Sequence, residues 1–504
     1  MDLPRSSGVL LHVSSLPGPQ IGDLGDAAHR WVDWLADAGQ SMWQILPLVP
    51  VNEGGSPYNG LSALAGNPLL VSPARLVDDG LLDASELRGA EGSRPEVDFA
   101  RVMAWKDHLL HRAFTRFRSG AAPEIRTALQ VFRARSGGWI EEYALFRALR
   151  DAHGGASWTT WERPIRLRES AAVQVWRERL SEQVEEHVFR EFLFERQWAA
   201  LHEHARTRGV RIVGDIPIFV AHDSADVWAN RELFYLDEEG QPTVVAGVPP
   251  DYFSKTGQRW GNPLYRWDVM QERGYRWWTE RFRRIFEQVD IARIDHFRGF
   301  EAYWEISAEE ETAMNGCWVS GPGAALFHAV ERELGPLPLI AEDLGLITAE
   351  VDELRDDLGL PGMRVLQFAF DGDPSNPHLP ANYPRNSVCY TGTHDNATVL
   401  GWWRDLDLAE REQVRRLIDP REAEVHWDLI RVAFQSTADW ALAPLQDVLG
   451  LGDKARMNTP GTAEGNWAWR MPENALTDDV QTRLLEITRS SSRLRACGST
   501  PPHP

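Results

Sequence analysis

The 504-residue chain has the composition of a soluble globular protein, with 43% hydrophobic residues, 25% charged residues and a formal net charge of −21. This charge argues against nucleic acid and anionic membranes as partners, because both require basic surfaces, and it leaves neutral ligands open. Three scattered cysteines are too few for a disulfide framework or a zinc site. With no signal peptide or membrane-length apolar run, we expect a cytoplasmic protein, a monomer or weak homo-oligomer. The 22 tryptophans fit either core packing or stacking against sugar faces.

The beginning of the chain reads as a βαβ unit. Gly8–Ser15 and Met42–Leu48 are short apolar runs typical of strands, and apolar residues recur at helical spacing from Asp23 to Ala38. A strand, a helix and a strand at this spacing predict parallel pairing. The Gly-, Ser- and Asn-rich stretch Asn52–Asn67 follows the second strand, at the end where α/β proteins place their sites.

A helical insertion is predicted next, because no convincing strand occurs between Ser72 and Gly209. Phe99–Phe117, Ile140–Ala152 and Ser181–Thr207 have helical periodicity. The expected domains are a catalytic barrel at 1–75 and 200–497, a mainly helical insertion at 76–199, and a disordered tail at 498–504.

Strands recur in the second half of the chain. Six further strands are expected at Arg211–Val220, Asp290–Asp295, Leu339–Leu344, Met363–Phe370, Ser387–Asp395 and Lys454–Thr459. Helices are expected at Tyr275–Val289, Phe327–Leu334 and Leu476–Arg495, and a long Gly/Pro-rich loop at 246–262. Eight strands with intervening helices fit a (β/α)₈ TIM barrel, an α/β fold, better than an open doubly wound sheet. No Gly-rich dinucleotide or phosphate loop follows any strand.

The fourth predicted strand contains two charges on one face. Arg293 and Asp295 are two residues apart in the segment DIARIDHFRGF, so their side chains point the same way. Burying them costs several kcal/mol unless they pair, and a nearby Arg lowers the pKa of an Asp by about 1–3 units. Taken alone, a structural ion pair at a strand end is the simpler interpretation; an ionised nucleophile or a metal ligand is the functional one.

Acidic residues recur at the carboxyl ends of predicted strands. They are Asp215, Asp295, Glu342, Asp371 and Asp395. A barrel converges its strand ends on one mouth, so we expect these carboxylates to share a site, although single members such as Asp215 or Asp371 could instead brace a loop.

We expect neither a metal nor another cofactor in this acidic cluster. It lacks His-x-His or His-x-x-x-His spacing, and Arg293 lies within it. His296 and His394 either contact a ligand or support the residues that do.

Two carboxylates with separated pKa values are what glycosidic bond cleavage requires. Asp295 beside Arg293 suits the ionised role. Glu342 suits the protonated role, because an apolar strand and a nearby anion both raise a carboxyl pKa. Its neighbour Asp343 lies on the opposite face, and strand parity alone leaves open which of the two points inward.

Several motifs resemble one known family. DIARIDHFRGF, LIAEDLG, YTGTHDN and NTPGTAEGNWAWR, with GDIPIFV, SPYNGLSALAGNP and GQRWGNPLY, are similar to the 4-α-glucanotransferases (amylomaltases or disproportionating enzymes) of the α-amylase-like superfamily. The resemblance implies that Asp295 is the nucleophile, Glu342 the acid/base and Asp395 the third carboxylate. It also implies sugar-binding positions at Tyr58, Asp215, Trp260, Arg293, His296, His394 and Asn466, and we add Asp371 from its predicted strand end.

The implied reaction is a retaining transfer between α-1,4-glucans through a covalent glucosyl intermediate on Asp295. The loop Val248–Ser254 is expected to act as a lid, with an inert connector as the alternative. Glu53 and Ala397 depart from the family pattern, which often has a tyrosine and an acidic residue there. The alternatives are a hydrolase with the same carboxylates and a non-catalytic glucan-binding protein.

Overall fold

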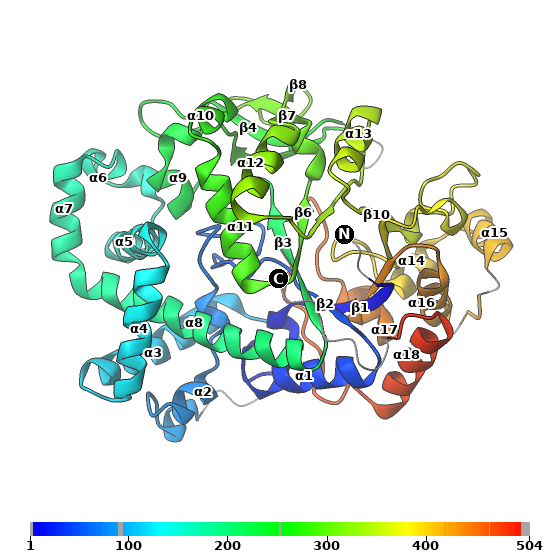
Figure 1. Cartoon of the computed structure of the whole chain (residues 1–504), viewed down its shortest axis with the longest axis horizontal. Coiled ribbons are helices and arrows are strands. Elements are labelled where there is room, and N and C mark those ends of the chain that lie inside the picture. Colours follow the sequence, from blue (N-terminus) through cyan, green and yellow to red (C-terminus); the bar gives the residue numbers. More distant parts are fainter. Residues whose placement is uncertain are drawn as a thin grey trace.

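A closed barrel of eight parallel strands forms the centre of the molecule (Figure 1). The computed structural model describes residues 4–88, 94–250, 254–418, 420–422, 424–462 and 464–494. The strands follow the spatial order β1-β12-β11-β10-β9-β6-β3-β2. They are β1 (Ser6–Leu10), β2 (Met42–Gln44), β3 (Arg211–Pro217), β6 (Ile291–Asp295), β9 (Leu339–Ala341), β10 (Gly362–Val365), β11 (Ser387–Tyr390) and β12 (Trp440–Pro444). The predicted (β/α)₈ class is confirmed.

Alternate residues of these strands fill the barrel. Seven of the strands each contribute one or two side chains to a buried apolar cluster, which includes Met42, Val213, Ile291, Met363 and Leu442. Side chains two apart on a strand share a face, so Arg293 and Asp295 follow Ile291 on the inner side and lie nearer the carboxyl end. The charged pair therefore sits where the apolar filling ends.

The eighth strand was wrongly predicted. It is β12, Trp440–Pro444, which pairs with β1 and β11, whereas Lys454–Thr459 begins within the short 3₁₀ helix Asp453–Ala455 and continues as a loop. The sequence WALAP is buried throughout and runs directly into the helix α17 (Leu445–Val448). A short, Ala-rich apolar run of this kind has no alternation that separates a strand from a buried helix.

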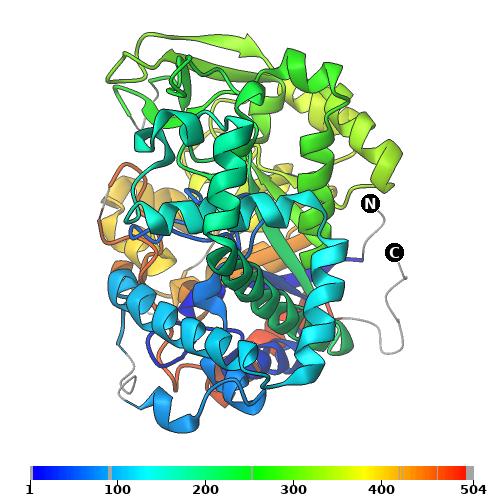
Figure 2. The ribbon, with the colours of Figure 1, turned by 90° about the vertical axis from the view of Figure 1, so that its left-hand side faces the viewer.

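The described residues between β2 and β3 form helices and no strand, as predicted. The α-helices are α2 (Pro73–Asp78), α3 (Phe99–Arg118), α4 (Pro123–Arg135), α5 (Gly138–Ala152), α6 (Arg163–Arg166), α7 (Ser170–Arg179) and α8 (Ser181–Thr207). They lie to one side of the barrel, as Figures 1 and 2 show. The helix α8 packs against α5 in the insertion and against α1 (Asp26–Asp37) beside the barrel, so it continues across the expected boundary at residue 199.

A four-stranded antiparallel sheet, absent from the sequence-based prediction, stands at one side of the barrel mouth (Figure 1). Its order is β5-β4-β7-β8, with β4 (Val244–Val248), β5 (Gln258–Pro263), β7 (Ala302–Ser307) and β8 (Gly316–Ser320). The stretch predicted as one long loop supplies β4 and β5, because its Gly and Pro residues interrupt the apolar alternation that signals a strand. Of the expected lid, residues 251–253 lie outside the described residues.

Other helices cover the barrel or extend its loops. They are α9 (Ala225–Ala229), α10 (Trp267–Glu272), α11 (Arg276–Gln288), α12 (Ala324–Leu334), α13 (Ala349–Asp357), α14 (Val399–Asp405), α15 (Leu408–Leu417), α16 (Val425–Gln435) and α18 (Asp478–Ser490). Within the described ranges, no helix combines the length and the apolar character needed to cross a membrane. The expected tail at 498–504 lies outside those ranges.

Candidate active site

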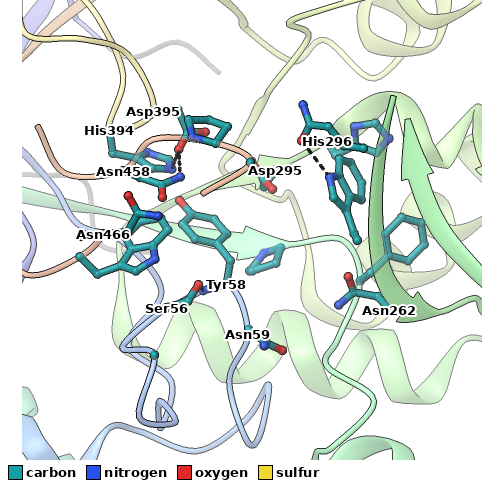
Figure 3. Close-up of a pocket in the computed structure, with 18 of the residues that line it drawn as sticks. Ser56, Tyr58, Asn59, Asn262, Asp295, His296, His394, Asp395, Asn458 and Asn466 are labelled. Atoms are coloured by element: carbon teal, nitrogen blue, oxygen red, sulfur yellow. Dashed lines mark hydrogen bonds and ion pairs between the residues drawn. The ribbon is translucent and has the colours of Figure 1, made fainter. Parts of the chain in front are cut away.

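A cavity of about 1520 Å³ opens at the carboxyl ends of the barrel strands. Every predicted site residue except Asp215 and Asp371 lines it. In Figure 3, Asp295 lies between two groups of side chains: His394, Asp395, Asn458 and Asn466 on one side, and His296 and Asn262 on the other. The sequence-predicted residues therefore converge on one pocket, and they come from several different strand ends.

Arg293 joins the pocket to a buried carboxylate beneath it. Its guanidinium lies 2.8 Å from an oxygen of Asp295 and donates to both oxygens of Asp215, at 2.9 and 2.7 Å. Although burial opposes the charge, the two aspartates raise the pKa of Arg293 well above its usual value. Asp215 also accepts a hydrogen bond of 2.7 Å from the Tyr58 hydroxyl. Asp215 thus holds Arg293 and Tyr58 in place without lining the pocket itself.

Glu342 follows β9 directly and both of its oxygens are held by main-chain groups. The N–H of His296 donates to Oε2 at 2.6 Å, and the N–H of Leu344 donates to Oε1 at 2.9 Å. Burial, with the charge of Asp295 in support, raises the pKa of Glu342 to about 8 even though Arg293 opposes the shift. The carboxyl group is therefore protonated at neutral pH.

The parity question between Glu342 and its neighbour is settled by the same strand. Asp343 is buried on the opposite side, where Arg355 donates to it at 2.6 Å and Arg364 at 3.2 Å. It also accepts the N–H of Met363. Asp343 is a structural ion-pair residue, and Glu342 is the one that faces the pocket.

Asp395 is held by residues that the sequence analysis missed. Asn458 donates to its Oδ1 at 2.6 Å, and the guanidinium of Arg456 donates to its main-chain carbonyl at 2.5 Å. His394 Nε2 lies 3.3 Å from the same Oδ1. Asn458 and Arg456 fall in the segment that was wrongly predicted as a strand, although the motif beginning at Asn458 was already recognised as resembling the family.

Two ring pairs form the walls of the pocket. Tyr58 stacks on His394, with ring centroids 5.1 Å apart and an angle of 13°. Trp260 meets His296 edge to face at 4.8 Å. His296 directly follows β6 and has a left-handed backbone conformation, with φ 54°, where the chain turns out of the strand. Burial lowers the pKa of His296 to about 4, so its ring is neutral, and its Nε2 has no hydrogen-bond partner within the described chain.

Comparison with known proteins identifies the family. The family model described as 4-alpha-glucanotransferase matches residues 11–477. A 4-alpha-glucanotransferase of Thermus thermophilus is 49% identical over 98% of this chain and 100% of its own length, and one of Synechocystis sp. is 48% identical over 97% and 98%. The chain belongs to the 4-alpha-glucanotransferase family. The solved amylomaltase of Streptococcus agalactiae, in complex with acarbose, superimposes with a TM-score of 0.94 at 36% identity and covers 97% of this chain and 100% of that one.

Membership of the 4-alpha-glucanotransferase family confirms the resemblance seen in the motifs. It also confirms the expected enzyme class, a transferase, and agrees with the closed barrel described above. The charged pair at Arg293 and Asp295, which alone favoured a structural ion pair, therefore lies in the pocket of an enzyme.

Four residues need separate placement within this 4-alpha-glucanotransferase. Glu53 and Ala397, which were expected to depart from the family pattern, both line the pocket. Asn466 lines it too, and its side chain accepts the N–H of Thr459 at 2.8 Å, which fixes the loop before it. Asp371 lies on an exposed turn, where its oxygen accepts the N–H of Asp373, because β10 already ends at Val365. The structure does not bring Asp371 into the pocket.

Proposed function

We propose that this 4-alpha-glucanotransferase works by a retaining mechanism, with a covalent glucosyl intermediate on Asp295. A segment of a donor α-1,4-glucan passes to Asp295 and then to the 4-hydroxyl of an acceptor glucan or of glucose. Glu342 protonates the leaving oxygen in the first step and takes the proton of the incoming hydroxyl in the second. The overall exchange conserves the number of glycosidic bonds and needs no cofactor.

The contrast between the two carboxyl environments carries the proposal. Asp295 has a cationic partner in Arg293 at 2.8 Å, which favours an anion able to attack a sugar carbon. Glu342 has a pKa raised to about 8, mainly by burial, which leaves it a proton to donate at neutral pH. A carboxyl group paired with an arginine and a second, protonated carboxyl group in the same pocket suit the two roles that retaining glycoside chemistry requires.

Asp395 completes the proposed machinery on the donor side. Its position beside Asn458 and His394 fixes one carboxylate oxygen, and the other can accept hydrogen bonds from hydroxyls of the reacting sugar. Tyr58, stacked on His394, offers a flat surface next to the same sugar. The S. agalactiae amylomaltase was solved in complex with acarbose, which supports an oligosaccharide-like ligand for this chain.

Product analysis after incubation with maltotriose tests the transfer. We expect glucose together with maltooligosaccharides longer than maltotriose, because the acceptor replaces water at the intermediate. Glucose and maltose with no longer product would assign a hydrolase instead. The variant Asp295→Asn is the matched control, and it should form neither set of products.

A glucan-binding protein without catalysis is the second alternative. It would bind maltotriose, for example in a calorimetric titration, and leave it intact. The presence of Asp295, Glu342 and Asp395 together in one pocket argues against it.

A further inference from the structure

An exposed tryptophan stands at the rim of the pocket, outside the set discussed so far. Trp318 lies on β8, the edge strand of the antiparallel sheet, and lines the cavity with 41% of its surface exposed. Leu346, on the loop after β9, lines the same part of the rim and is 55% exposed. Large apolar side chains left open inside a polar pocket mark a surface that a ligand covers.

An arginine that also lines the cavity packs against the indole ring of Trp318. The guanidinium carbon of Arg298 lies 3.8 Å from the ring centroid, which is a close cation–π contact. Arg298 is itself buried and donates a hydrogen bond to the main-chain carbonyl of Leu346. One ring face is therefore fixed by a residue that also ties the β9 loop to the rim.

The sheet adds a second support. Trp304 pairs with Trp318 across β7 and β8, and the two rings meet edge to face at 5.2 Å. The ring of Trp304 is anchored by a hydrogen bond of 2.9 Å from its Nε1 to the carbonyl of Ala313. Held by two neighbours, Trp318 loses little side-chain freedom when a ligand stacks on it.

The position of the ring indicates which part of a glucan it meets. Arg298 lies three residues after Asp295, and Leu346 follows the strand end that carries Glu342, so Trp318 stands on the Glu342 side of the pocket. Asp395, His394 and Asn458 lie across Asp295 from His296 (Figure 3), and the N–H of His296 donates to Glu342. The proton donor faces the leaving group, which departs where the acceptor later enters.

We propose that Trp318 is a stacking platform for an acceptor glucose unit beyond the one next to the reacting bond. The inference rests on the proposed function, because it assigns the Glu342 side of the pocket to the acceptor. The apolar face of a glucopyranose ring lies on the indole ring, and Leu346 extends the same surface. His296 follows Asp295 in the chain and Trp260 meets its ring edge to face, so these two serve the first acceptor unit and Trp318 adds affinity only for acceptors longer than glucose.

Acceptor kinetics with Trp318→Ala test the platform. The donor is a maltoheptaose labelled and blocked at its non-reducing end, so that it cannot act as an acceptor. Initial transfer rates are measured with glucose, maltose and maltotetraose as acceptors. We expect the KM for maltotetraose to rise about tenfold, the KM for glucose to stay within about twofold, and kcat to change little, because one stacking contact is lost.

Three further variants sharpen the result. Trp318→Tyr keeps a flat ring and should recover most of the affinity for maltotetraose. Arg298→Gln frees the ring without removing it and should give a smaller rise in the same KM. Met314→Ala, which changes another exposed side chain of the same sheet region, should leave all acceptor constants unchanged.

The outcomes separate the platform from the proposed function. Equal rises in KM for glucose and maltotetraose, or no change for either, would overturn the platform. An unchanged acceptor profile together with altered self-association in light scattering would reassign Trp318 to a contact between copies of the chain. Absence of labelled transfer product in the unmodified enzyme would instead overturn the proposed transfer.

Discussion

Two buried arginines at opposite ends of the barrel show how one residue type serves two purposes. At the mouth, Arg293 faces the carboxylates of Asp215 and Asp295. At the base, Arg493 is fully buried, and its hydrogen bonds to the described residues all go to main-chain carbonyls, those of Ser6, Phe434, Ser436, Ala438 and Asp439. Carboxylates raise the pKa of Arg293, whereas burial, with Arg5 nearby, lowers that of Arg493.

The difference lies in what each charge does for its partners. Carbonyls have no proton equilibrium to shift, so Arg493 contributes only hydrogen bonds that tie the start of β1 to the loop before β12. Carboxylates do have one, and Arg293 places its positive charge 2.8 Å from an oxygen of Asp295, the proposed nucleophile. A barrel thus places stabilising polar contacts at the amino ends of its strands and reactive ones at the carboxyl ends.

The largest effect is expected at the mouth, from Asp295→Asn. The variant loses the proposed nucleophile, so turnover of maltotriose should fall by about 10³- to 10⁵-fold. Arg293 keeps Asp215, so the protein should still fold, with a somewhat lower melting temperature. Product chromatography and a thermal melt check both points, and near-normal turnover would refute the nucleophile assignment.

At the base of the barrel, Arg493→Met should lower the stability of the protein and leave catalysis almost unchanged. Several buried carbonyls lose a charged donor, so the free energy of unfolding should fall by about 3 kcal/mol or more. Denaturant titration measures the loss, and kcat of the folded fraction should stay within about twofold. Arg5→Met is the matched control, because Arg5 donates to the same segment from a less buried position, and its loss should be smaller. Equal losses in the two variants would contradict the special role of Arg493.

Replacing the buried acid Glu342 at the mouth should increase stability, in contrast to the loss expected for Arg493→Met. The pKa of Glu342 in the folded chain, about 8, lies above its ordinary value of 4.5. The folded state therefore holds a proton that the unfolded state releases between these values, and stability falls as pH rises through this window. Glu342→Gln removes that penalty, so at pH 9 the free energy of unfolding of the variant should be about 1–3 kcal/mol larger than that of the unmodified protein.

The same comparison at pH 4 is the control for Glu342→Gln. There the glutamate is protonated in both states, so the two proteins should differ little. The variant should be inactive at either pH, because it has no proton to transfer. A stabilisation that did not depend on pH would rule out the raised pKa as its cause.

The smallest effect is expected from Asp371→Asn. The side chain lies on an exposed turn outside the pocket, so transfer rates should stay within about twofold and stability within about 0.5 kcal/mol. Asp215→Asn is the instructive partner, because it changes the buried carboxyl group between Arg293 and Tyr58. Steady-state kinetics on both variants separate a carboxylate that supports the site from one that does not.

Most of the barrel could be predicted from the sequence because its strands are short apolar runs bounded by turns. Helices with a clear apolar face, such as α8 and α11, were found to within a few residues. β12 was missed because WALAP continues into a buried helix without a change of pattern. The antiparallel sheet was missed because β5, with the sequence QRWGNP, contains turn-forming residues within the strand.

Site residues could be predicted from the sequence where they end a strand or directly follow one. Asp295 and Glu342 satisfy that rule. Asp371 does not, because its predicted strand ends early and the chain then turns away from the pocket. Asn458 and Arg456 reach Asp395 from a loop, so only the tertiary fold brings them together. The resemblance to the family, rather than strand parity, selected Glu342 over Asp343.

The pairing of β1 with β12 governs when a newly made chain can close its barrel. Ser6 lies opposite Trp440, so the two strands are separated by more than four hundred residues of sequence. At about 5–20 residues per second, translation of that stretch takes about 20–90 s, during which β1 has an unpaired edge. A chain that stops before β12 leaves the barrel open, and both β1 and β11 then keep unpaired edges that can pair with other chains. Premature termination should therefore yield aggregates rather than a weakened enzyme.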